Sequence, residues 1–194
     1  MKPHNHLIRG KDLLNKITFR RRLRPLILII LTLFLPSAAF GEEKVLETFY
    51  ASIYYQTDED LTDFAGRISR SPYASRHEGE QSKTDLKQDI DKIVYRVKTL
   101  LDMYPQNMRF SVRIYTDPQG VRERYAEHSK RGKAPIAFYS HQTKTIYCAL
   151  QNLSGGIFAH EVAHAVINFY FPITPPAQMQ EILAQYVDKH LWDE

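Results

Sequence analysis

After residue 44, hydrophobic residues follow one of two spacings along the chain. Where they alternate with polar residues a strand is predicted, and where they recur at every third or fourth position a helix is predicted. Strands are predicted at 45–55, 108–115, 136–140 and 144–149. Helices are predicted at 57–68, 82–104, 117–128, 154–171 and 174–187. The order of these elements predicts an α+β domain in which helices pack on one small mixed sheet.

Polar residues between these elements mark loops and helix ends. Residues 71–81 and 129–134 are predicted to be loops, the first for its proline, glycine and mixed charge and the second for its basic residues. Ser154 is placed to cap the helix that follows it. Thr174, which precedes two prolines, is predicted to cap the last helix.

The N-terminal segment has the pattern of a secretory signal. Its first 24 residues hold eight Lys/Arg and one acid, residues 26–35 are almost wholly apolar, and small residues follow. We therefore expect residues 1–41 to be a signal peptide, cleaved after Gly41 or after Ala39, with the domain 42–194 exported to the periplasm. The alternative is an uncleaved anchor with its basic side inside, and only then would the protein contact a membrane.

The charge of the chain follows from this division. The whole chain has a net charge of +4, but residues 1–41 contribute +7, and residues 42–194 carry 18 Lys/Arg against 21 Asp/Glu. The basic character therefore belongs to the signal, and nucleic acid is not an expected partner. The exported part is long enough for one domain with its own core. Cys148 is the only cysteine, which excludes an intramolecular disulfide and predicts a buried thiol.

The predicted helix at 154–171 contains the pattern His-Glu-x-x-His. Residues four apart on a helix lie about 40° apart around its axis, so His160 and His164 can hold one metal ion. Glu161 is next to the first histidine and can act on a water beside that metal. This arrangement is typical of a zinc hydrolase, and the alternative is a buried helix with two partly satisfied histidines.

A third metal ligand is predicted on the last helix. Glu181 lies in a run where Met179, Ile182 and Leu183 are apolar. A lone carboxylate among apolar side chains is costly unless it is paired or bound to a cation, and one zinc ion would satisfy it. The alternative is an ordinary solvated glutamate.

His160-Glu161-x-x-His164, followed by Glu181-x-x-Ala184, resembles the small single-domain gluzincin zinc metallopeptidases, or peptidase MA-like proteins. The resemblance implies a zincin-like domain with an active-site helix and a following glutamate helix. It also implies that the two histidines and Glu181 bind one zinc ion, that Glu161 is the general base, and that the substrate is a peptide or protein. Ala184 would let the two helices approach closely.

The sequence departs from this family in three places. The spacer between His164 and Glu181 is short, position 185 is Gln where relatives carry an acid, and only 13 residues follow Glu181. The C-terminal subdomain that supplies a transition-state-stabilising residue is therefore not expected. A competing class is an envelope binding or assembly module that holds zinc without activity. A structural domain without zinc ranks last, because it would leave Glu181 unpaired.

Further residues are considered for roles near the predicted metal site. The resemblance implies that the strand 144–149 is an edge strand that pairs with an extended substrate, whereas the alternative is an interior strand. Asp188, seven residues after Glu181, is a candidate to orient a metal-bound histidine. Four other histidines are expected outside the metal site: His77, His128, His141 and His190. For His141, which lies in a hairpin turn, the expectation is a surface position and the alternative is a position that faces a cleft. Three tyrosines are weak candidates to stabilise an oxyanion, with packing as their default role: Tyr147, Tyr170 and Tyr186.

Overall fold

The computed structural model describes residues 43–69, 80–128 and 133–193, so the predicted signal peptide, His77 and most of the two predicted loops lie outside it. Within these ranges the protein has an α+β fold of five strands and five helices. The strands are β1 (Lys44–Glu47), β2 (Ala51–Tyr55), β3 (Phe110–Tyr115), β4 (Ala137–Ser140) and β5 (Thr145–Ala149). The helices are α2 (Asp58–Ile68), α3 (Glu80–Leu101), α4 (Pro118–His128), α5 (Gly155–Tyr170) and α6 (Ala177–His190).

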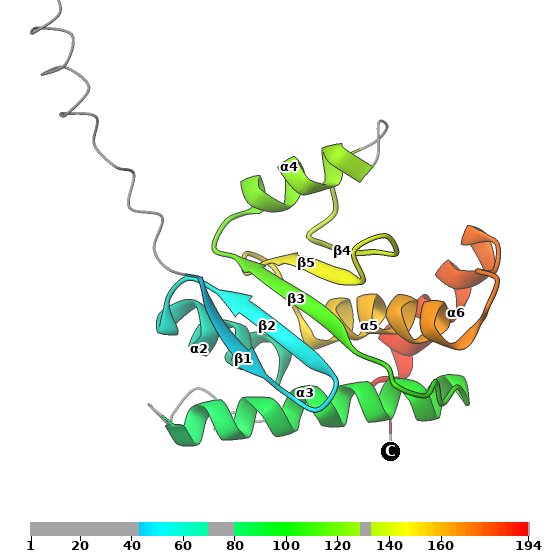
Figure 1. Cartoon of the computed structure of the whole chain (residues 1–194), viewed down its shortest axis with the longest axis horizontal. Coiled ribbons are helices and arrows are strands. Elements are labelled where there is room, and N and C mark those ends of the chain that lie inside the picture. Colours follow the sequence, from blue (N-terminus) through cyan, green and yellow to red (C-terminus); the bar gives the residue numbers. More distant parts are fainter. Residues whose placement is uncertain (1–42, 70–79, 129–132, 194) are drawn as a thin grey trace, which may run out of the picture. The chain divides into compact units, whose positions relative to one another are not determined.

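The strands form one mixed sheet in the order β1-β2-β3-β5-β4 (Figure 1). β2, β3 and β5 are parallel neighbours, while β1 and β4 run antiparallel at the two edges. The expectation of an edge strand at 144–149 was therefore wrong, and its alternative is confirmed, because β5 lies between β3 and β4. The edge strand nearest α5 in the chain is β4.

The predicted single strand at 45–55 was also wrong, because a tight turn divides it into β1 and β2. Thr48 makes this turn: its backbone N–H donates to Ala51 O at 2.8 Å, and its side-chain hydroxyl accepts from Ala51 N at 2.9 Å. A threonine hydroxyl can replace a backbone partner in this way, so a β-branched residue does not always continue a strand.

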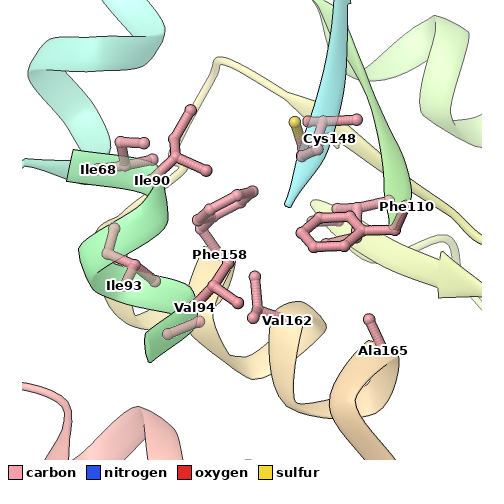
Figure 2. Close-up of a cluster of buried hydrophobic side chains, with 14 of the residues drawn as sticks. Ile68, Ile90, Ile93, Val94, Phe110, Cys148, Phe158, Val162 and Ala165 are labelled. Atoms are coloured by element: carbon pink, nitrogen blue, oxygen red, sulfur yellow. The ribbon is translucent and has the colours of Figure 1, made fainter. Parts of the chain in front are cut away.

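Helices cover the two faces of the sheet unequally. α2, α3 and α5 lie on one face, and α4 lies on the other, above β3, β5 and β4 (Figure 1). The main core fills the first face, where Phe158 of α5 points into a cluster of apolar side chains from α2, α3, β3 and β5 (Figure 2). Cys148 is fully buried in this core, as predicted. A smaller cluster around Val121 and Phe138 holds α4 on the second face.

The two helices at the C-terminal end of the chain begin differently. Ser154 caps α5 as predicted, because its hydroxyl accepts from the backbone N–H of Ile157 at 3.2 Å. The predicted cap at Thr174 is wrong, since α6 begins at Ala177 with Pro176 in the cap position. A residue before a proline is held in an extended conformation, so Pro175 cannot enter the helix.

The buried face of α6 includes Ala184, the residue expected to let the two helices approach. Gln180, Ala184 and Val187 face inward and Leu183 is half-buried against the core, whereas three large side chains of this helix are exposed: Met179, Ile182 and Tyr186. Small inward residues let α6 lie close to α5. Among the described residues, no helix combines the length and apolar character needed to cross a membrane.

Candidate metal centre

Helix α5 places the two motif histidines on one face. Their side chains are mostly buried, with exposed fractions of 21% for His160 and 12% for His164. The two Nε2 atoms lie 3.3 Å apart, so both rings direct the same nitrogen to one point. This confirms the geometry that the four-residue spacing predicted.

Helix α6 brings Glu181 to the same point. One carboxylate oxygen lies 3.5 Å from His160 Nε2, and the other lies 3.3 Å from His164 Nε2. The three residues form the His-His-Glu group within metal-binding distance among the described residues. The Glu181 side chain is 52% exposed, however, so the prediction that burial demands a cation there was wrong. The position of Glu181 on α6, rather than burial among apolar neighbours, brings its carboxylate to the two histidines.

Close contact between α5 and α6 fixes this arrangement. Ala184 is fully buried at the contact. A Cβ atom at Gly156 would lie 2.1 Å from Asp188 Oδ1, so the glycine leaves room for the Asp188 side chain. Within the described part of the chain, Asp188 makes no hydrogen bond to His160 or His164, which leaves its expected orienting role without support.

Burial keeps His164 in the neutral form that can bind a metal. Desolvation is the main cause that lowers its pKa, to about 4, and the neighbouring His160 lowers it further. The Glu181 carboxylate and a hydrogen bond with the Gln180 side chain act in the opposite direction. Gln180 is itself held in place, because its Nε2 donates to Pro175 O at 2.7 Å.

Glu161 lies on the inner side of α5, beside the edge strand. Its Oε2 accepts a hydrogen bond of 2.7 Å from the backbone N–H of Tyr139 on β4, which leaves Oε1 for another partner. Burial raises the Glu161 pKa to about 8, the Tyr139 N–H lowers it, and the Glu181 charge raises it. A cation held by the neighbouring ligands would favour the ionised carboxylate.

A pocket of about 340 Å³ joins these residues. His160, His164, Glu161 and Glu181 line one side. The other side comes from the segment around β4 and from α4: Tyr125, Pro135, Ala137, Phe138, Tyr139 and His141. The pocket therefore lies along the β4 edge of the sheet, where the four residues of the strand are buried.

Two residues of this pocket were not predicted as part of the site. Tyr139 holds Glu161 through its backbone, and no side-chain pattern reports a backbone contact. His141 was expected in a surface turn, with a position facing a cleft as the alternative; it is exposed, and it also lines the pocket. Its position in the turn between β4 and β5 was the available signal.

The other described histidines and tyrosines that the sequence singled out lie outside the pocket. His128 is exposed on α4, and His190 pairs with Asp193. Tyr147 is buried and stacks on Phe138, whereas Tyr170 and Tyr186 are largely exposed. None of these five residues lines the pocket within the described part of the chain.

Comparison of the chain with models of known protein families, with curated proteins and with solved structures gives no match.

Proposed function

We propose that the chain is a zinc-dependent metallopeptidase of the gluzincin type, with a zincin-like domain that acts after export. The carrying observation is the convergence of His160, His164 and Glu181 on one point, with Glu161 in the same pocket. A closed structural zinc site uses four protein ligands, whereas a catalytic site uses three and leaves a position for water or substrate. Three protein ligands and an adjoining pocket favour the catalytic class.

The two histidine nitrogens are spaced like ligands of one tetrahedral zinc ion. Ligand atoms about 2.0–2.1 Å from such an ion lie about 3.3–3.4 Å from each other. The two Nε2 atoms are 3.3 Å apart, and Glu181 places one oxygen 3.5 Å from His160 Nε2 and its other oxygen 3.3 Å from His164 Nε2. With one oxygen of Glu181, the three ligand atoms lie within 4.8 Å of one another. Two imidazoles and one carboxylate are also a ligand set that zinc hydrolases use. The donor set and its spacing therefore support zinc as the metal.

When bound, zinc would activate a water molecule and polarise the scissile carbonyl. Glu161 would then act as the general base at its Oε1, because Oε2 is held by Tyr139. It would accept a proton from the attacking water and donate it to the leaving amine.

The edge strand β4 supports a peptide as the substrate. Because the Tyr139 N–H donates to Glu161 rather than to β5, Tyr139 directs its main-chain groups outward. Main-chain groups alternate in direction along an edge strand, so Ala137 faces outward as well. The Tyr139 N–H is already taken by Glu161, so an extended peptide could pair with this edge only over a short length, through the Tyr139 carbonyl and the main-chain groups of Ala137. Such a peptide would pass the metal ligands, which is the physics of β-augmentation.

Cleavage of a broad peptide library by the purified full chain tests this function. We expect cleavage with about one equivalent of zinc bound, loss of cleavage after treatment with a chelator, and recovery when zinc is added back. Fully zinc-loaded protein that cleaves no peptide would contradict the peptidase and leave the zinc-binding module.

That competing function, a zinc-binding module without turnover, has one observation in its favour. Glu161 is almost fully buried, and burial raises its pKa to about 8. A carboxylate that stays protonated at neutral pH cannot act as a base. We rank the peptidase first because a bound cation beside the carboxylate would reverse this shift.

His141 is the residue of the pocket that we expect to assist the reaction, because an imidazole N–H can donate a hydrogen bond to a developing oxyanion. The variant His141→Asn should lower kcat by about tenfold or more while zinc content stays unchanged. His128→Asn is the matched control, since His128 is exposed on α4 outside the pocket. Equal kcat in the His141 variant and wild type would remove this residue from the mechanism.

A further inference from the structure

A second pocket lies away from the metal ligands, between the β1–β2 turn, the end of α3 and the start of β3. Its volume is about 560 Å³. The lining comprises Thr48, Phe49, Tyr50, Lys98, Pro105, Asn107, Met108 and Arg109. It therefore combines aromatic and apolar walls with two cationic side chains, and none of the described residues that line it is acidic.

Lys98 is the unusual residue of this pocket. It is only 8% exposed, although lysine is almost never buried without a charged partner. Its Nζ lies 3.5 Å from the Tyr50 hydroxyl, and it lies 4.9 Å and 5.8 Å from the ring centroids of Tyr50 and Tyr104. Among the residues that the structure describes, no carboxylate lies within ion-pair distance of it.

These contacts stabilise the ammonium group only in part. A hydroxyl at 3.5 Å is a long hydrogen-bond partner, and contact with an aromatic face offsets a fraction of the loss of water. Desolvation of an unpaired cation is strongly unfavourable. An anion bound in the pocket would supply the missing charge.

The β1–β2 turn, which forms another part of the pocket lining, is held in place by hydrogen bonds. Arg109 donates to the backbone carbonyls of Thr48 and Phe49 at 3.2 Å and 3.1 Å, and it pairs with Glu47 at 2.5 Å. From α3, Asp91 accepts the backbone N–H groups of Phe49 and Tyr50. The β1–β2 turn is thus held on both sides, and the Arg109 charge is already paired.

We propose that this pocket binds a small aromatic or aliphatic monocarboxylate. One unpaired ammonium matches one negative charge, and the surrounding side chains match an apolar body. A phosphate group is less suited, because phosphate sites use several backbone N–H groups or a free arginine fork. The volume is within the range of about 300–1,000 Å³ typical of small-ligand sites. The inference does not depend on the metal centre.

Titration calorimetry with 3-phenylpropionate as the probe tests the proposal. The full chain should carry His164→Ala so that the metal centre does not compete for the carboxylate. We expect saturable binding, weakened at least about tenfold in Lys98→Met, since a charge-assisted contact is lost. The neutral 3-phenylpropanamide should bind equally weakly to both proteins, and phenyl phosphate should bind more weakly than the carboxylate.

Lys92→Met is the matched control, because Lys92 lies on the same helix with 71% of its side chain exposed. It should bind the probe as the parent does. Lys98→Met should fold with equal or higher thermal stability, because an apolar residue of similar length removes the buried charge. If it does not fold, Lys98→Gln takes its place.

Three results would overturn the proposal. They are the absence of binding at millimolar probe, equal affinity of the Lys98 variant and the parent for 3-phenylpropionate, and tighter binding of phenyl phosphate than of the carboxylate. Since all proteins in this test lack His164, failure here leaves the proposed peptidase untouched, and failure of the peptidase leaves this test valid.

Discussion

Glu161→Gln is expected to abolish peptide cleavage while the protein keeps its fold and its zinc. Loss of a general base typically lowers turnover by about 100-fold or more. The fold should persist because the glutamine side-chain oxygen can still accept the Tyr139 N–H that Oε2 accepts in the wild type. Turnover on a peptide found in the library screen, zinc content and thermal unfolding together measure this result.

Glu123→Gln makes the same chemical change on the exposed surface of α4 and should leave all three quantities unchanged. A Glu161→Gln protein as active as wild type would exclude the general-base mechanism. The same pair of proteins, compared by cleavage of a whole exported proteome, would also identify the substrate.

The second large effect is expected for His164→Ala, which removes one of three metal ligands. Changes in groups that merely orient a ligand cost about 10–100-fold in metal affinity, so loss of a ligand should cost more than about 100-fold. Zinc analysis of the purified protein should show occupancy far below one equivalent, and cleavage should be lost with the metal.

Glu181→Ala separates the third ligand from the first two. It should also lose zinc, because Glu181 is the group that α6 contributes to the cluster. Full occupancy in this variant would remove Glu181 from the ligand set. His190→Ala is the control, since His190 lies on the same helix and pairs with Asp193 outside the cluster.

Local patterns predicted the parts of the site that lie within one helix. The four-residue spacing placed His160 and His164 together because helix geometry fixes the relation between neighbouring turns. The Ser154 cap and the boundaries of α5 were predictable for the same reason. The approach of Glu181 depends on α6 packing on α5, and it was inferred from a burial argument that the 52% exposure of its side chain contradicts.

The errors of prediction came from contacts between distant segments. The order β3-β5-β4 determines that β5 is interior, and a strand's own sequence does not report its neighbours. Ala184 was expected between α6 and α5 and is buried, whereas the exposure of Met179 and Ile182 could not be predicted from the sequence of α6 alone. The long side chain of Lys98 gave no sign of burial, because lysine on a helix surface is usually exposed.

The hydrogen bond between Tyr139 and Glu161 also has a consequence for solubility. An exposed edge strand presents unpaired N–H and C=O groups and is a template for aggregation with another sheet. On β4, the outward N–H of Tyr139 is already taken by a carboxylate from within the same domain. A second molecule that paired strand to strand along this edge would find one donor missing and a buried acid behind it. Glu161 therefore leaves a short stretch of this edge for a peptide but makes the edge a poor template for long pairing with another copy of the chain.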